Sequence, residues 1–157
     1  MSADMHLNEL NRRYFILGST AMAAFAALTS PSSAQTPVPT AEELIKAITK
    51  DVKPADGKVA LDLPEIAENG NTVPFSFTVE SPMTAADHVK AVHVIAPGNP
   101  RAEIGSYYFS PQSGKASASS RMRLAKTQDI VAIAEMSDGK MFMTKRAVKV
   151  TIGGCGG

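Results

Sequence analysis

The sequence predicts an all-β fold, an antiparallel β-sandwich preceded by one short helix. From Lys58 onward apolar residues recur at every second position, which is the pattern of half-buried strands. Turn sequences such as Pro97-Gly98-Asn99-Pro100 separate these stretches at regular intervals, and no amphipathic helix lies between any two of them. Because parallel strands need long crossover connections, this arrangement favours an antiparallel sandwich over a parallel α/β fold.

The first 34 residues have the features of a twin-arginine signal peptide. Arg12-Arg13 precede a short apolar run from Gly18 to Leu28, and Ser32-Ser33-Ala34 offers small residues for cleavage after Ala34. The run is far shorter than the roughly 20 residues that a membrane-spanning helix needs. The alternative is a cytosolic domain with an amphipathic N-terminus. The three features together favour removal of residues 1–34 and a periplasmic location, reached by the twin-arginine route.

A single domain is predicted for residues 40–152, after a linker at residues 35–39. Thr40 and Glu43 have the spacing of a capping box, so a helix is expected to begin at Thr40. Apolar residues follow at helical spacing as far as Ile48, and Pro54 with Gly57 ends the element.

Six to seven strands are predicted between Lys58 and Ile152. They are expected near residues 59–63, 73–79, 89–96, 102–109, 115–126, 130–136 and 141–152. Pro74 cannot donate to a strand ladder, so its strand is expected to begin there or to lie at a sheet edge. Gly105 is a candidate bulge, and Ser137-Asp138-Gly139 has the composition of a hairpin turn.

Charge excludes one class of partner. The chain has 16 Lys and Arg against 15 Asp and Glu, a net charge of +1, which argues against nucleic-acid binding. Acidic residues concentrate in the N-terminal third of the mature chain and basic residues in the C-terminal third. Solvated strand faces explain most of them. The alternative is a positive rim beside the C-terminus, which would attract anions.

The chain ends in Gly153-Gly154-Cys155-Gly156-Gly157, and Cys155 is its only cysteine. A lone thiol in an oxidising compartment is either a reactive group or a route to dimers. The four glycines have no side chain to pack, so residues 153–157 are predicted to form a flexible arm that carries the thiol. A free thiol titrates near ~8.5, and no helix N-terminus or base lies beside Cys155 in the sequence. We therefore expect an accessible thiol that depends on a partner's active site for its chemistry.

Other chemistry-bearing residues give weaker signals. Met141, Met143 and, across the hairpin, Met136 would offer soft sulfur ligands to Cu(I), although methionine more commonly packs in a core. His88 and His93 fall on opposite faces of a strand, so they are not expected to chelate together. No catalytic triad, carboxylate pair or phosphate-binding loop is legible, and neither a cofactor nor a metal is expected. A periplasmic Cu(I)-binding or thiol redox-sensing module remains the competing prediction.

The last ten residues, Val148-Lys149-Val150-Thr151-Ile152-Gly153-Gly154-Cys155-Gly156-Gly157, resemble the C-terminus of the SoxY family. These proteins are the sulfur carriers of the periplasmic Sox system for thiosulfate oxidation. The similarity covers the chain from about Gly70 to its end. It includes Ser81-Pro82-Met83-Thr84, Gly98-Asn99-Pro100 and Arg123-Leu124-Ala125-Lys126-Thr127-Gln128.

The resemblance implies an immunoglobulin-like sandwich that forms a heterodimer with a second small β-protein, SoxZ. It also implies that Cys155 carries thiosulfate-derived sulfur covalently, in a carrier subunit that is not itself an enzyme. In that scheme the haem enzyme SoxAX joins thiosulfate to the thiol, and the hydrolase SoxB releases sulfate. The dehydrogenase SoxCD, where present, then oxidises the remaining sulfur. Valine at Gly153 and Gly154 is expected to block this turnover and to leave the fold intact, because its side chain would hinder access to narrow active-site channels.

Overall fold

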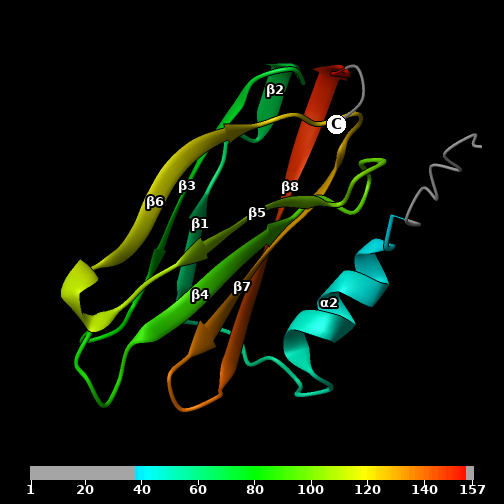
Figure 1. Cartoon of the computed structure of the whole chain (residues 1–157). Helices are drawn as coiled ribbons and strands as arrows, with labels where there is room; N and C mark the ends of the chain where they lie inside the picture. Colours follow the sequence, from blue (N-terminus) through cyan, green and yellow to red (C-terminus); the bar gives the residue numbers. More distant parts are fainter. Residues whose placement is uncertain (1–37, 155–157) are drawn as a thin grey trace, which may run out of the picture. The chain divides into compact units, whose positions relative to one another are not determined.

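The computed structural model describes residues 38–154, which form a sandwich of two β-sheets with a helix on the outside of one of them (Figure 1). The first sheet has the strand order β1-β3-β6: Val59–Asp62, Val73–Val79 and Ala116–Met122. The second has the order β2-β8-β7-β4-β5: Ile66–Asn69, Met141–Ile152, Gln128–Met136, Val89–Ile95 and Glu103–Tyr108. The predicted all-β sandwich is confirmed. The proposed signal peptide, residues 35–37 of the linker and residues 155–157 lie outside the described residues.

Alternation along each strand builds the interior between the sheets. In β3 every second residue is buried, and the intervening ones face outward. Phe77 packs edge to face against Tyr107 of β5, with ring centroids 5.0 Å apart. Val92 and Ala132 contribute to the same cluster from β4 and β7. The period of two therefore reflects burial of one face of each sheet against the other.

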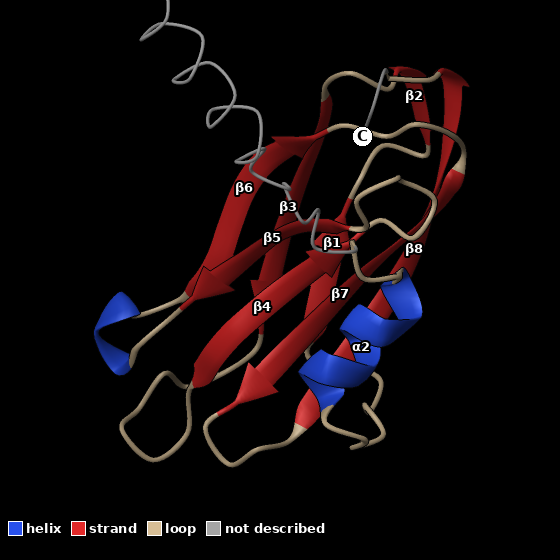
Figure 2. Cartoon of the chain, turned by 45° about the vertical axis from the view of Figure 1, so that its right-hand side comes forward, coloured by secondary structure: helices blue, strands red, loops and turns tan. Residues whose placement is uncertain are grey.

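Helix α2, Ala41–Thr49, covers the outer face of the five-stranded sheet (Figure 2). It begins with the predicted capping box, in which the Thr40 N–H donates to Glu43 Oε2 (2.8 Å) and the Glu43 N–H donates to Thr40 Oγ1 (3.3 Å). It ends at Thr49, and the capping residue Lys50 that follows has a left-handed φ of 50°. Its apolar side packs on a second cluster of buried residues, which consists of Ile95, Ala102, Val131, Ile133 and Met141.

Strand β2 was not predicted, and it changes the topology. It pairs parallel with β8, with Ile66 opposite Lys149, whereas all the other strand pairs of residues 38–154 are antiparallel. Only Ala67 of its four residues is buried, so the sequence carries no alternation that would reveal it. Strand β6 is also shorter than predicted, because it ends at Met122 and Leu124 lies buried in the following loop.

Two local predictions agree with the structure. The β4–β5 register shifts between Val94 and Ile95, opposite Gly105 and Glu103, as the bulge at Gly105 predicted. At Pro74 the strand has a neighbour only in β6, since β1 pairs with residues 76–79.

A short 3₁₀ turn, η1 at Pro111–Ser113, lies between β5 and β6. Within residues 38–154 no helix is long and apolar enough to cross a membrane.

Candidate functional site

Strand β8 carries the chain to one end of the sandwich, where it runs beside β2 with Asn69 opposite Ile152. Two loops reach the same place (Figure 1): the turn between β2 and β3 at residues 70–72, and the loop between β6 and β7 at residues 123–127. Gly154 contacts both loops. It is the residue directly before Cys155, so this end of the sandwich is the base of the predicted arm.

Three backbone hydrogen bonds join these segments into an arrangement that we call the arm clasp, formed by Gly70, Leu124, Ile152 and Gly154. The Gly154 N–H donates to Leu124 O (2.9 Å), and the Leu124 N–H donates to Gly70 O (2.7 Å). The Gly70 N–H donates to Ile152 O (2.8 Å). Gly70, Leu124 and Gly154 are all buried. The end of the described chain is therefore bound to two loops that are distant in sequence.

Close packing requires glycine at positions 70, 153 and 154. A Cβ atom on Gly70 would overlap Leu124 O and lie 2.6 Å from Gly154 N, and one on Gly154 would lie 2.8 Å from Gly70 O. A Cβ atom on Gly153 would overlap Ala125 O. None of the three has a positive φ, so the requirement is steric. Valine at Gly153 or Gly154 would displace a neighbouring loop, and the expectation that it leaves the fold intact is wrong at this end of the sandwich.

The buried side chain of Asn99 supports the loop that binds Gly154. Asn99 Nδ2 donates to Arg123 O (2.8 Å), and Asn99 Oδ1 accepts from the Ala125 N–H (3.0 Å) and from Gln128 Nε2 (2.9 Å). Gln128 Oε1 in turn accepts from the Gly98 N–H (2.6 Å). These hydrogen bonds join the turn between β4 and β5 to the β6–β7 loop.

Two of the motifs that carry the family resemblance therefore meet at the base of the C-terminal motif, residues 148–157. Gly98-Asn99-Pro100 and residues 123–128 are joined through Asn99, and Thr127 ties the second motif to β8 because the Val150 N–H donates to Thr127 Oγ1 (2.9 Å). The sequence pattern predicts a turn and a strand for these motifs, and it does not indicate that Gly70 and Asn99 belong to the site. The available signal was a polar Asn within a Gly-Pro turn, a position where a side chain often bonds to backbone.

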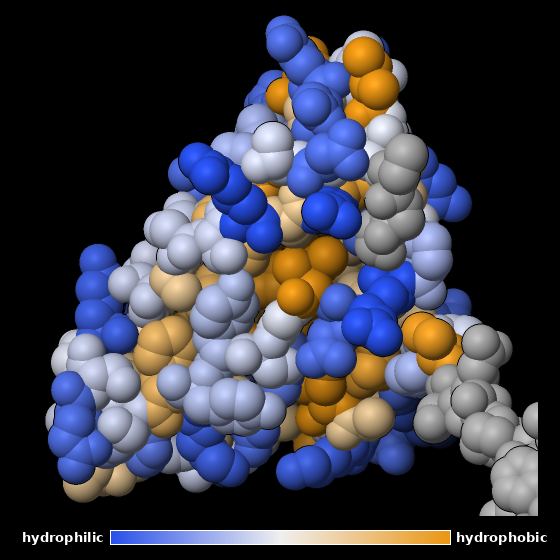
Figure 3. All heavy atoms as spheres, turned by 45° about the horizontal axis from the view of Figure 1, so that its top comes forward, coloured by the Kyte–Doolittle hydropathy of each residue, from blue (hydrophilic) through white to orange (hydrophobic). Residues whose placement is uncertain are grey.

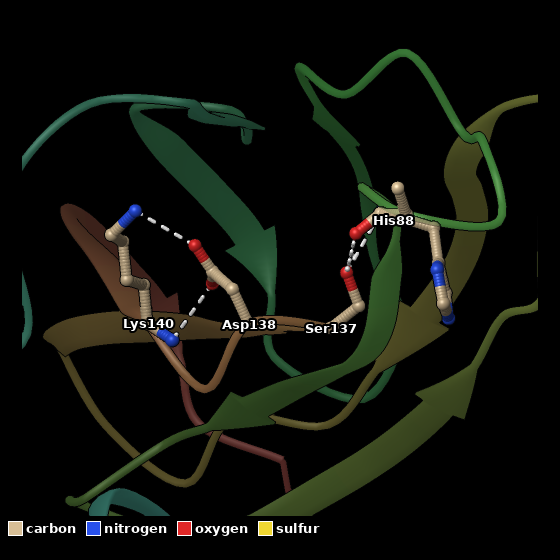
Figure 4. A network of polar contacts seen from close by, with 5 residues as sticks. His88, Ser137, Asp138 and Lys140 are labelled. Carbon is tan, nitrogen blue, oxygen red and sulfur yellow. Dashed lines mark hydrogen bonds and ion pairs between the residues drawn. The ribbon is translucent and has the colours of Figure 1, made fainter.

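The remaining motif, Ser81-Pro82-Met83-Thr84, follows β3 at the end of the sandwich away from the clasp. Ser81 Oγ accepts from the Met83 N–H (3.2 Å), and the backbone nearby pairs with the β7–β8 hairpin. There the His88 N–H donates to Ser137 Oγ (3.1 Å), and the Ser137 N–H donates to His88 O (2.8 Å; Figure 4). This motif builds a turn and contributes nothing to the arm base.

The same hairpin holds an exposed ion pair. Lys140 Nζ lies 2.7 Å from Asp138 Oδ2, and hydrogen bonding to Lys140 lowers the pKa of the Asp138 carboxyl (Figure 4). The hairpin predicted at Ser137-Asp138-Gly139 is confirmed, since Gly139 has a φ of 82° in the turn.

The two histidines are not brought together. His88 Nδ1 lies 3.1 Å from Thr84 O, whereas His93 Nδ1 lies 2.8 Å from Ser106 Oγ, which donates to Glu103 Oε1. Burial lowers the pKa of His93, and the nearby carboxylates of Glu135 and Glu103 partly oppose that shift. No group of three or more His, Cys, Asp or Glu side chains suited to a metal occurs within residues 38–154.

The three methionines considered as Cu(I) ligands lie on different faces of the five-stranded sheet. Met136 is 1 % exposed and belongs to the interior cluster between the sheets. Met141 is 4 % exposed, and it packs with Met143 in the outer cluster that α2 covers. The sheet separates Met136 from the other two, so the core-packing interpretation is confirmed.

Fold and site together define a β-sandwich protein whose C-terminal segment is bound between two loops and continues to a lone cysteine. Residues 45–155, most of the chain, match the protein family described as "Sulfur oxidation protein SoxY". The protein belongs to the SoxY family.

Several solved structures are similar to the chain. The sulfur carrier protein SoxY from Chlorobium limicola f thiosulfatophilum is 29% identical, with a TM-score of 0.60 over 71% of this chain and 96% of that chain. A superoxide reductase (neelaredoxin) from Ignicoccus hospitalis is 16% identical, with a TM-score of 0.55 over 60% of this chain and 80% of that chain. A putative superoxide reductase from Thermotoga maritima is 18% identical, with a TM-score of 0.52 over 66% and 89%. The reductases share the fold alone. No curated protein matches the sequence.

Proposed function

We propose that the protein is a periplasmic sulfur carrier for thiosulfate oxidation, which holds sulfur intermediates covalently on Cys155 and presents them to other enzymes. The observation that carries this proposal is the position of Gly154, which is bound at the tip of the sandwich directly before the only cysteine of the chain. Membership of the SoxY family and the likeness to the sulfur carrier of C. limicola support it. The protein itself then needs no catalytic group.

The proposed loading step is an oxidation. A bond forms between Cys155 Sγ and the sulfane sulfur of thiosulfate, the thiol proton is released, and two electrons pass to the haem enzyme, which is the oxidant. Water then attacks the terminal sulfonate under a hydrolase, sulfate leaves, and one additional sulfur stays on the cysteine. Covalent attachment keeps these intermediates from diffusing away and raises their effective concentration at each enzyme.

Two further parts of the proposal concern assembly and location. A SoxZ-like subunit is the proposed stable partner, and SoxAX, SoxB and, where present, SoxCD are the transient ones. Export by the twin-arginine route rests on Arg12-Arg13 and the apolar run that follows. Both come from the sequence motifs and the family of the chain.

Intact-mass spectrometry tests the carrier function. The protein is incubated with thiosulfate and the haem enzyme, and a covalent sulfur adduct is expected on the wild-type chain. The Cys155→Ser variant is expected to show none, because serine offers no thiol. Tight stoichiometric copper binding without any sulfur adduct would overturn the proposal in favour of a copper module.

A further inference from the structure

We infer that the arm clasp fixes the point from which the thiol-bearing segment leaves the sandwich, and that Gly70 is a positioning residue for transfer of the cargo. This inference rests on the proposed carrier function. It assigns a role to a turn between β2 and β3 that lies more than half of the chain away from Cys155 and belongs to none of the quoted motifs.

The clasp brings the last bound residue of the described chain next to Cys155 in the sequence. Strand pairing ends at Ile152, and an arm that started there would place Cys155 on the order of 10 Å beyond the sandwich. The bond from the Gly154 N–H to Leu124 O moves that starting point two residues along the chain. The Cα atom of Cys155 then lies about 3.8 Å from that of a bound residue. Opening the clasp would release Gly153 and Gly154 and extend the reach by about 7 Å.

Gly70 is the residue on which closure depends. Its N–H and its carbonyl both take part in the clasp, and a Cβ atom at this position would meet Leu124 O and Gly154 N at once. Alanine there cannot be accommodated unless Gly154, Leu124 or both move away. The effect should be confined to this end of the sandwich, because the atoms that the added Cβ would meet most closely are all backbone atoms of the clasp itself.

A fixed point at which the arm leaves the sandwich should favour docking of the thiol into the loading enzyme. An enzyme that accepts the thiol must order whatever part of the arm is free, and the cost in entropy grows with the number of residues to be ordered. With the clasp closed, two fewer residues need to be ordered on binding. An open clasp should therefore weaken the encounter with the loading enzyme and leave the chemical step itself nearly unchanged.

The first measurement is amide hydrogen exchange by NMR on the wild type, on Gly70→Ala and on Gly105→Ala. Gly105 is the matched control, since the nearest atom to a Cβ there would be a ring carbon of Tyr107 at an ordinary 3.7 Å. We expect the Gly154 amide to exchange about tenfold faster in Gly70→Ala than in the other two proteins. The amides of Val92 and Ile133 in the central strands should stay protected in all three.

The second measurement is steady-state loading of the carrier by the haem enzyme with thiosulfate. For Gly70→Ala we expect KM for the carrier to rise about threefold or more, with kcat within about twofold of the wild-type value. Gly153→Ala provides a second route to an open clasp, because the added Cβ would overlap Ala125 O and Gly153 is exposed. It should reproduce the change in KM even if Gly70→Ala proves unstable.

Two results would overturn the inference. One is equal exchange of the Gly154 amide in the wild type and Gly70→Ala, which would mean that the clasp is not closed in solution. The other is faster exchange with an unchanged KM, which would mean that the clasp does not position the thiol. Failure of the carrier function would look different: the wild-type chain would acquire no sulfur adduct, whatever its exchange rates.

Discussion

The amide of Asn99 connects two loops at the arm end of the sandwich. It makes three hydrogen bonds, to Arg123 O, to the Ala125 N–H and to Gln128 Nε2, and it is only 7 % exposed. A buried polar group that loses its partner costs far more than an ordinary hydrogen bond contributes. The partners of Asn99 are two backbone groups and one side chain that lie close to the clasp.

Replacing Asn99 should therefore destabilise the protein measurably. Asn99→Ala leaves up to three polar groups without their partner, and we expect the free energy of unfolding to fall by about 2–4 kcal/mol. Denaturant unfolding followed by circular dichroism measures this. Asn71→Ala is the control, since Asn71 is exposed in the neighbouring turn, and it should stay within about 0.5 kcal/mol of wild type. Equal stabilities of the two variants would contradict this account of Asn99.

The glycines before Cys155 show what local sequence can and cannot reveal. Their composition predicted an arm, because a run without side chains has nothing to pack. It could not reveal that Gly153 and Gly154 lie against Ala125 and Gly70, since those contacts come from loops elsewhere in the chain. A glycine that gives the backbone flexibility and a glycine that allows close packing look the same in a sequence. Only the tertiary neighbours distinguish the two roles.

At the level of elements, prediction succeeded wherever burial is periodic. The capping box at Thr40 and the alternation in β3 are local patterns with a direct physical cause. Strand β2 was missed because it is short, mostly exposed and held by pairing with β8. Strand β6 was predicted too long because Leu124 continues the alternation of Met122. Leu124 is buried, but it lies in the loop after the strand, at the clasp.

Helix α2 protects an apolar surface of the larger sheet, and a single charge should remove it. Leu44 packs in the outer cluster with Met141 and Met143. In Leu44→Asp a carboxylate would have to be buried without a partner, so the helix should undock. We expect Met141 and Met143 to be oxidised by hydrogen peroxide about fivefold faster than in the wild type, as measured by peptide mass spectrometry.

Two controls define that experiment. Ala47→Asp introduces the same charge on the exposed side of α2 and should leave both methionines as slow as in the wild type. Met136, which lies in the interior between the sheets, should remain slow in every variant as long as the sandwich is folded. Slow oxidation of Met141 in Leu44→Asp would mean that the helix stays docked or is not what shields this face.

Across the whole molecule, the basic residues of the C-terminal third do not form one continuous rim. Lys140 belongs to the hairpin at the far end, where it pairs with Asp138. Arg123 and Lys126 instead lie exposed on the loop that binds Gly154, and Arg101 lies exposed in the turn that supports it. Figure 3 views this end, and hydrophilic side chains occupy much of it around smaller apolar areas. The segments at residues 69–72, 97–102, 123–127 and 150–154 contain no Asp or Glu.

Such a distribution should make the thiol of Cys155 selective for anions. Local positive potential raises the concentration of anionic reactants, and thiosulfate is one. The test measures two rates for Cys155, one with an anionic aromatic disulfide and one with a neutral dipyridyl disulfide. The ratio of the anionic rate to the neutral rate is then independent of steric access. In the double variant Arg123→Gln/Lys126→Gln the anionic-to-neutral ratio should fall about threefold at low ionic strength.

Salt and position separate this effect from a change in structure. The difference between the double variant and the wild type should disappear near ~1 M salt, where the screening length shrinks to about 3 Å. Lys140→Gln removes a charge at the opposite end of the sandwich, and its ratio should match the wild type at every salt concentration. A ratio that falls equally in Lys140→Gln would assign the selectivity to net charge and not to the arm end. A ratio that is unchanged in the double variant would show that Arg123 and Lys126 do not act on the thiol, and that the segments beside the clasp serve only to hold it.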